Sequence, residues 1–178
     1  MADRNEWGYP LQENYSLARI GADVSEAPTL RGATMSAQVN HRPEAQRELS
    51  IVFIDDDFNL RRSATDLLAE YGIHVIGFAA QGCLTLKTLS AAEDLYGPVD
   101  ALILDERLPH MRGLEATRLV RRFYPDLPVI LYTAFAHMLG DEPTQAGVTS
   151  QVSKADHPLT LIRAIRSACD PNPATVLA

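Results

Sequence analysis

Cysteine is scarce in this chain of 178 residues, which contains only Cys83 and Cys169. Two cysteines far apart in the sequence provide neither a disulfide framework nor the short ligand spacing of a zinc site. A reducing compartment fits such a chain best, and we therefore expect a cytoplasmic protein.

Long apolar runs are also missing. No stretch approaches the roughly 18 continuous apolar residues that a membrane-spanning helix needs. The first residues, Met1 to Leu11, do not combine a basic region with an apolar stretch, as a secretory signal would. We expect no contact with a membrane.

Basic side chains are outnumbered, with 16 Lys and Arg against 23 Asp and Glu, which gives a net charge of −7. Nucleic-acid binding needs basic side chains to neutralise phosphates, so this balance argues mildly against it. The residues after the last expected helix, 171–178, are too few for a helix-turn-helix. Direct nucleic-acid binding is therefore not expected.

Hydrophobic periodicity is weak over residues 1–48, which mix Pro, Gly, Asn, Gln, Ser and charged residues. Such a segment cannot bury a core, and we predict a mostly disordered N-terminal arm. Met35 is an alternative start. Residues 49–170 are predicted to form one domain, and residues 171–178 a short C-terminal tail.

From Leu49 onward, strand-like runs alternate with helical patterns, as in βαβ units. The predicted strands cover residues 50–54, 74–78, 100–105, 129–133 and 150–153. The predicted helices cover residues 59–71, 82–95, 114–124 and a stretch beginning near Pro158, while Gly140 and Pro143 interrupt a helix in 136–147. This pattern predicts an α/β fold: a doubly wound, five-stranded parallel sheet with helices on both faces.

Three local backbone features are also predicted. Asp57 is expected to cap the first helix, because acidic side chains suit helix N-termini. Gly72 is expected in a left-handed conformation at the end of that helix. Gly113 is expected to supply a positive φ before the third helix or simply to begin that helix.

Chemically useful side chains follow the expected strands directly. The first run ends in Asp55 and Asp56, the third in Asp105, the fourth in Thr133, and the weak fifth run precedes Lys154. In open α/β sheets, ligands bind outside the carboxyl ends of the strands, so these side chains should converge. Adjacent carboxylates repel unless a cation neutralises them, and Mg²⁺ prefers such oxygen ligands.

Together these groups suit phosphoryl chemistry. A carboxylate such as Asp105 can act as a nucleophile and form an aspartyl phosphate. Mg²⁺ and the Lys154 ammonium would stabilise negative charge on the phosphoryl oxygens. The Thr133 hydroxyl could donate a hydrogen bond to another of those oxygens.

The joint pattern resembles the receiver domain of two-component response regulators over about residues 49–168. The matching motifs are Ile51-Val52-Phe53-Ile54-Asp55-Asp56-Asp57, Asp100 to Glu115 with Asp105, Pro109 and Gly113, Pro128-Val129-Ile130-Leu131-Tyr132-Thr133-Ala134, and Ala146-Gly147 leading to Lys154. The resemblance implies a flavodoxin-like sheet of order 2-1-3-4-5.

The resemblance also implies roles for single residues. Asp105 would be the phosphoacceptor, Thr133 the switch hydroxyl and Lys154 the phosphoryl-binding lysine. The ligands of Mg²⁺ would be Asp55, Asp56, Asp105 and the main-chain carbonyl of Arg107. The donor would be a phosphohistidine on a sensor histidine kinase or a histidine phosphotransfer protein. The domain would catalyse its own phosphorylation and dephosphorylation, without being a conventional metabolic enzyme, and would signal to a downstream protein target without an attached effector.

Three departures from the family pattern stand out, one of which is the interruption of the fourth helix by Gly140 and Pro143. Ala155 follows the lysine where the family usually has proline, and a cis bond there would cost roughly 2.5–4 kcal/mol. Gln151 occupies a position that usually carries Tyr or Phe, and an amide cannot fill an aromatic pocket. Phe135 and Arg107, each two residues beyond a site residue, are expected to flank the path of a hydrolytic water.

These departures leave alternatives open. The second candidate is a phosphorylation-independent pseudo-receiver that acts as a protein-binding module. The third is a metal-dependent phosphatase or hydrolase with Asp105 as nucleophile, although Arg107 then stands where such enzymes place a second acid. Whether the domain forms a homodimer through its last helices stays open.

Overall fold

The computed structural model describes residues 47–170. The expected arm over residues 1–48, apart from its last two residues, and the expected tail over residues 171–178 lie outside this range. Within it, no helix is long and apolar enough to cross a membrane.

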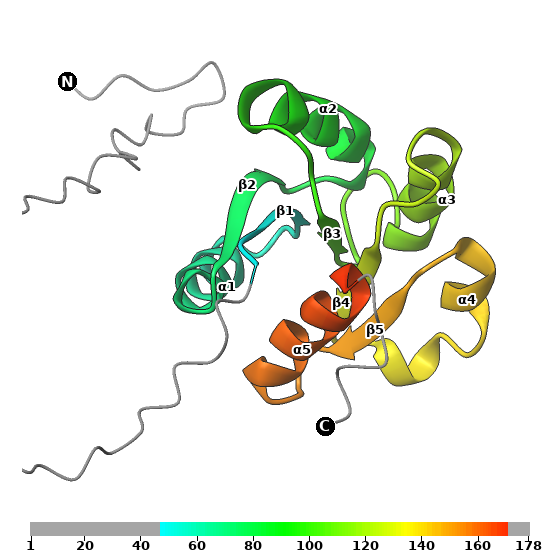
Figure 1. Ribbon diagram of the computed structural model, residues 1–178. Coiled ribbons are helices and arrows are strands. Elements are labelled where there is room, and N and C mark those ends of the chain that lie inside the picture. The colour runs from blue at the N-terminus through cyan, green and yellow to red at the C-terminus, as the bar shows by residue number, and fades with distance from the viewer. Residues whose placement is uncertain (1–46, 171–178) are drawn as a thin grey trace, which may run out of the picture. The chain divides into compact units, whose positions relative to one another are not determined.

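Five strands form one parallel sheet in the order β2-β1-β3-β4-β5 (Figure 1). The strands are β1 (Leu49–Ile54), β2 (Ile73–Ala79), β3 (Ala101–Leu104), β4 (Val129–Thr133) and β5 (Ser150–Ser153). The predicted doubly wound sheet and its order are therefore confirmed.

The helices follow the strands in alternation. They are α1 (Phe58–Glu70), the 3₁₀ turn η1 (Gly82–Leu84), α2 (Thr85–Tyr96), α3 (Gly113–Phe123), the 3₁₀ turn η2 (Ala136–Met138), α4 (Glu142–Ala146) and α5 (Pro158–Cys169). The interruption predicted between 136 and 147 is confirmed, because this region forms only a 3₁₀ turn and a five-residue helix.

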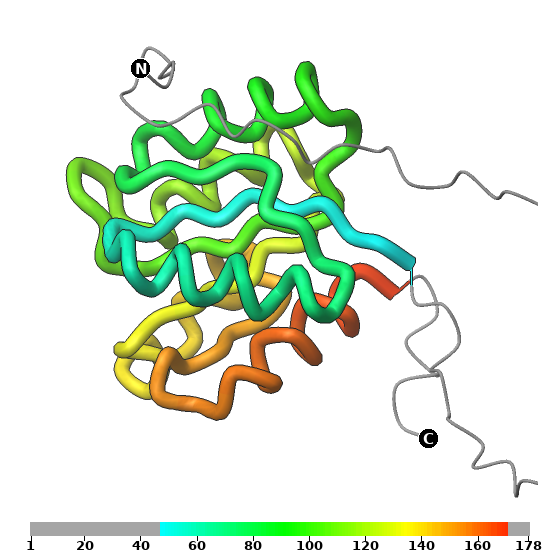
Figure 2. The backbone as a smooth tube through the Cα atoms, turned by 90° about the vertical axis from the view of Figure 1, so that its left-hand side faces the viewer, coloured from blue at the N-terminus to red at the C-terminus, as the bar shows by residue number. Residues whose placement is uncertain are grey.

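The core has one layer on each face of the sheet, because successive side chains of a strand point to opposite faces. On β1, Ile51 and Phe53 pack with α1 and α5, whereas Val52 and Ile54 pack with α2 and α3. A smaller cluster joins Leu131 to α4. In Figure 2, α1 and α5 lie on one side of the strands and α2 and α3 on the other.

Two of the three local predictions are confirmed. The Asp57 carboxylate accepts hydrogen bonds from the first turn of α1, and Gly72 has a φ of +65°. For Gly113 the predicted positive φ is wrong, whereas the simple helix start is confirmed, because α3 begins at this residue. The positive φ of this loop belongs to His110, and Gly113 is instead required by close approach, since a Cβ there would lie 2.2 Å from the carbonyl oxygen of Asp105.

Candidate functional site

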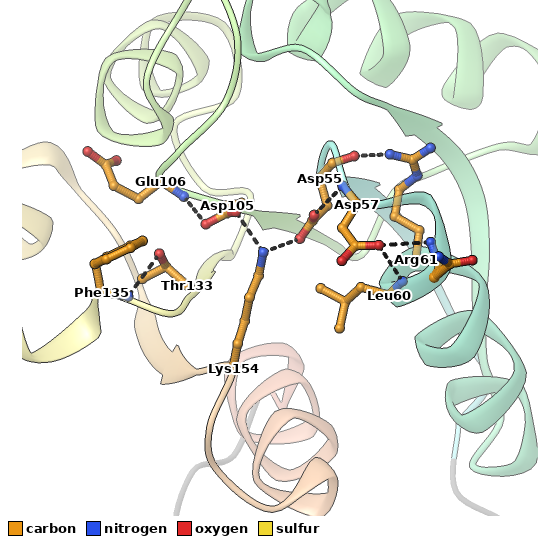
Figure 3. A network of polar contacts seen from close by, with 10 residues as sticks. Asp55, Asp57, Leu60, Arg61, Asp105, Glu106, Thr133, Phe135 and Lys154 are labelled. Atoms are coloured by element: carbon orange, nitrogen blue, oxygen red, sulfur yellow. Dashed lines mark hydrogen bonds and ion pairs between the residues drawn. The ribbon is translucent and has the colours of Figure 1, made fainter.

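The carboxyl ends of four strands bring the predicted site residues to one edge of the sheet. Asp55 follows β1, Asp105 follows β3, Thr133 ends β4 and Lys154 follows β5. Figure 3 shows Asp55 and Asp105 on either side of the Lys154 amine. The convergence expected from the strand positions is present.

Lys154 bridges two buried carboxylates. Its Nζ lies 2.6 Å from Oδ2 of Asp105 and 2.8 Å from Oδ2 of Asp55. Burial alone would lower the pKa of this amine, but the hydrogen bonds to the two carboxylates outweigh burial and raise the pKa above its usual value. The ammonium is therefore fully charged at neutral pH.

Asp55 is the most deeply buried of the acids, with no exposed surface. Its Oδ1 accepts a hydrogen bond of 2.9 Å from the backbone N–H of Asp57, and its carbonyl accepts one from the buried Arg61 guanidinium. Burial raises the pKa of the Asp55 carboxyl, and the contact with Lys154 opposes this shift only in part. Lys154 thus favours the charged form of a carboxyl group whose burial disfavours it.

Asp105 has both carboxylate oxygens engaged. Oδ1 accepts a short hydrogen bond of 2.6 Å from the N–H of Glu106, and Oδ2 contacts Lys154. The residue is buried, with 5% of its surface exposed. These contacts fix the direction from which the carboxylate can be approached.

The three predicted carboxylates form an acidic cluster. One oxygen each from Asp55, Asp56 and Asp105 lies within 4.8 Å of the others, and Asp56 is exposed while the other two are buried. An all-oxygen set that is open to solvent on one side fits Mg²⁺, which keeps several waters. Arg107, the fourth expected ligand through its carbonyl, lies in the loop two residues after Asp105.

Thr133 is fully buried, and its Oγ1 accepts a long hydrogen bond of 3.4 Å from the N–H of Phe135. The Thr133 carbonyl accepts a hydrogen bond of 3.0 Å from the Lys154 N–H, which joins the ends of β4 and β5. The guanidinium of Arg107 lies over the ring of Phe135, 3.7 Å from the ring centroid. The two residues expected to flank a water path therefore pack against each other.

Glu106 is a residue that sequence reasoning missed. It is 1% exposed, and its Oε2 accepts a hydrogen bond of 2.8 Å from the N–H of Leu114 at the start of α3. Its Oε1 lies 2.5 Å from a guanidinium nitrogen of Arg112. The helix N-terminus and the arginine compensate the burial of this charge. An acidic residue beside Asp105 gives no local signal that it will fold back onto a helix eight residues later.

Gln151 stands where the family usually has Tyr or Phe, and its side chain makes a polar contact. It is exposed on β5, and its amide donates a hydrogen bond to the carbonyl of Ala136 in η2. The peptide bond before Ala155 is trans. Both departures noted in the sequence thus have a definite local structure.

The geometry defines a class of protein: an α/β domain with an acidic cluster, a lysine and a hydroxyl at one sheet edge. The family model for the response regulator receiver domain matches residues 51–166. The chain therefore belongs to the response regulator receiver domain family.

Curated relatives agree with this assignment. The response regulator UvrY of Escherichia coli O6:H1 is 31% identical over 67% of this chain. The cyclic di-GMP phosphodiesterase response regulator RpfG of Xanthomonas campestris is 34% identical over 71% of this chain. The matches cover only 53% of UvrY and 32% of RpfG, so this chain corresponds to a part of each.

Solved structures share the fold. A CheY-like receiver domain protein from Methanospirillum hungatei is 22% identical, with a TM-score of 0.61 over 70% of this chain and 95% of that one. The response regulator TrrA from Thermotoga maritima, solved in complex with Mg²⁺ and BeF, is 28% identical, with a TM-score of 0.59 over 67% of this chain and 98% of that one. Receiver domains bind Mg²⁺, receive phosphoryl groups from kinases and signal to partners, and the present chain carries the corresponding acidic cluster.

Proposed function

We propose that this domain accepts a phosphoryl group on Asp105 in a reaction that requires Mg²⁺. The carboxylate of Asp105 attacks the phosphorus of a phosphohistidine, a new O–P bond forms, and the P–N bond to the donor breaks. The histidine leaves with the electron pair of that bond and takes up a proton. The donor is a sensor histidine kinase or a histidine phosphotransfer protein.

The observation that carries the proposal is the bridging position of Lys154. An ammonium held at 2.6 Å from Asp105 and 2.8 Å from Asp55 would stabilise the negative charge that develops on a phosphoryl group transferred to Asp105. An amine that served only solubility would point to solvent. Thr133, at the end of β4, would donate a hydrogen bond from its hydroxyl group to a phosphoryl oxygen.

Asp55, Asp56, Asp105 and the carbonyl of Arg107 would hold the Mg²⁺ ion. The ion would supply positive charge that screens the carboxylates from each other and from the incoming phosphoryl oxygens. The complex of TrrA with Mg²⁺ and BeF supports this assignment, because TrrA is a relative with the same fold. The domain itself would carry out phosphorylation and dephosphorylation.

The signal would leave the domain through protein–protein contacts in the cytoplasm. Phosphorylation adds charge and new hydrogen bonds that only one conformation can satisfy, and the partner binds that conformation. The relatives include a regulator whose solved structure is described as DNA-binding. We assign no such activity to residues 47–170, and we propose a protein as the downstream target.

Labelling with radioactive acetyl phosphate tests the reaction without knowledge of the kinase. Wild-type protein should be labelled in Mg²⁺ and not in EDTA, and Asp105→Asn should not be labelled. Asp126→Asn, which changes an exposed acid on the α3–β4 loop, is the matched control and should label like wild type. Equal labelling of wild type and Asp105→Asn would show that Asp105 is not the acceptor.

A pseudo-receiver that binds proteins without phosphorylation is the second candidate. The five-residue α4 and the Gln151 side chain favour it, since both alter the region that follows the switch hydroxyl. The metal distinguishes the two candidates. A pseudo-receiver should show no Mg²⁺ affinity at neutral pH, whereas the proposed receiver should bind Mg²⁺ and lose that binding in Asp56→Asn.

A further inference from the structure

The segment that follows β4 is held from two sides. Gln151 on β5 donates an amide hydrogen bond to the carbonyl of Ala136. One residue earlier, the ring of Phe135 stacks on the guanidinium of Arg107, which belongs to the loop after β3. Because β3 and β5 flank β4 in the sheet, the segment contacts β5 on one side and the loop after β3 on the other.

This segment is also joined to the proposed switch hydroxyl. The N–H of Phe135 donates to Oγ1 of Thr133 at 3.4 Å, which is long for a hydrogen bond. A hydroxyl that turns toward an oxygen on Asp105 must either leave this N–H behind or draw the backbone with it (Figure 3). In both cases Phe135 and Ala136 are the first residues to respond.

The Ala136 carbonyl has two donors. It accepts from the amide of Gln151 and, at 3.5 Å, from the N–H of Leu139 within the η2 turn. The N–H of Met138 bonds the Phe135 carbonyl at 2.9 Å in the same turn. The glutamine therefore anchors a whole turn to β5, and movement of that turn requires the amide contact to break or to follow.

We propose that Gln151 is a positioning residue that stabilises the phosphate-free arrangement of residues 135–139 through its hydrogen bond to Ala136. The contact holds the turn behind Thr133 in place until a phosphoryl group on Asp105 draws the hydroxyl away. This inference rests on the proposed function for its second half, the response to a group on Asp105. Its first half, the anchoring of the turn, concerns the unmodified protein alone.

Removing the hydrogen bond between Gln151 and Ala136 should then favour the conformation that has a phosphoryl group, or a mimic of one, on Asp105. A contact made in only one of two conformations shifts the equilibrium between them by its own free energy. The net contribution of an ordinary hydrogen bond corresponds to about a two- to tenfold change in an equilibrium constant. We expect a variant without the amide donor to bind a phosphoryl mimic two- to tenfold more tightly at fixed Mg²⁺.

Two substitutions separate the donor from the shape of the side chain. Gln151→Glu keeps the size but replaces the donating amide by an accepting carboxylate, and Gln151→Leu removes all polarity. Gln145→Leu makes the same change at an exposed glutamine of α4 and serves as the control. Beryllium fluoride with Mg²⁺ is the probe, and its binding is followed by ¹⁹F NMR. Both Gln151 variants should bind more tightly than wild type, and Gln145→Leu should match wild type.

Amide hydrogen exchange of the unmodified, Mg²⁺-free proteins tests the anchoring directly. The N–H groups of Met138 and Leu139 should exchange faster in both Gln151 variants than in wild type or in Gln145→Leu, while the strands keep their protection. Unchanged exchange in the Gln151 variants overturns the proposal. Faster amide exchange with unchanged binding of beryllium fluoride overturns the proposed coupling between the turn and a group on Asp105. Failure of wild type to bind the probe overturns the proposed function but leaves the exchange result standing.

Discussion

At the scale of single residues, charge compensation dominates the site. Asp55, Asp105 and Glu106 are all buried acids with a basic partner: the two aspartates share Lys154, while Glu106 has Arg112 and the start of α3. Asp105 and Glu106, although adjacent in the sequence, therefore contact different cations. The ammonium of Lys154 lies between the two aspartates of the candidate site.

Phe135 is expected to set the lifetime of the phosphorylated form. Its ring and the Arg107 guanidinium stack beside the site, and a side chain that crowds the approach of water slows hydrolysis. We expect Phe135→Ala to shorten the half-life of the phosphorylated protein on the order of severalfold, since about 1 kcal/mol of barrier is a factor of five or more. The half-life is measured by loss of radioactive label after removal of acetyl phosphate.

Two further variants make this prediction specific. Phe123→Ala removes an equally large ring from the distant end of α3, where it is 64% exposed, and should leave the half-life unchanged. Phe135→Leu keeps most of the bulk but loses the stack on Arg107. A half-life in Phe135→Ala equal to that of wild type would remove the screening role.

At the scale of elements, the connection from β3 to α3 is the most constrained. The N–H of Gly113 bonds the carbonyl of Glu106 at 3.0 Å, and a Cβ at Gly113 would lie 2.2 Å from the Asp105 carbonyl oxygen. The atoms nearest to such a Cβ all belong to the backbone of Asp105 and Glu106, so no flexible side chain could move aside to make room. The start of α3 therefore fixes the backbone of Asp105, the proposed phosphoacceptor.

Gly113→Ala should damage stability and chemistry together. The backbone of Asp105 or of α3 must shift, and overpacking of this kind typically costs about 1–3 kcal/mol. We expect a lower urea midpoint and slower labelling by acetyl phosphate. Gly140→Ala is the contrasting control, because a Cβ there meets nothing within 4 Å and the only strain comes from a φ of +51°. It should lose about 1–2 kcal/mol of stability and label normally. Normal labelling of Gly113→Ala would contradict this role of the close approach.

The sequence predicts the bounds of several elements to within one residue. The bounds of β4 and β5 agree with the predicted strands, and α1 differs from its prediction by one residue at each end. Strand positions also placed Asp105 and Lys154 at the same sheet edge, because parallel strands end together. The position of Gly113 was predicted but not its reason: a clash with a residue eight positions earlier depends on the loop path, which no local pattern encodes.

Long-range polar contacts were the least predictable part. Gln151 was predicted only as the absence of an aromatic ring, and its hydrogen bond to Ala136 depends on where η2 begins relative to β5. Arg121 is a similar case: it donates to the Gly147 carbonyl at 2.8 Å and to the Leu127 carbonyl at 2.5 Å, and so joins α3 to the α4–β5 and α3–β4 connections. The sequence around an arginine in a helix does not indicate which distant carbonyl groups its guanidinium will contact.

At the scale of the whole described domain, the acidic cluster concentrates negative charge at one edge of the sheet. One oxygen each from Asp55, Asp56 and Asp105 lies within 4.8 Å of the others, and the ammonium of Lys154 contacts Asp55 and Asp105. The proposed Mg²⁺ ion would add positive charge to carboxylates that only the folded chain brings together. We therefore expect the ion to stabilise the fold.

Mg²⁺ should accordingly raise the free energy of unfolding, because it binds the folded cluster and not the unfolded chain. At ten times its dissociation constant, the gain should be about 1.4 kcal/mol. The gain is measured as the difference between urea unfolding curves with MgCl₂ and with NaCl at matched ionic strength, since salt alone screens surface charge. Asp56→Asn should be at least as stable as wild type without Mg²⁺ and should gain less from it. Asp94→Asn, which changes an exposed acid on α2, should gain as much as wild type. An equal gain in Asp56→Asn and wild type would place the stabilising ion elsewhere on the molecule.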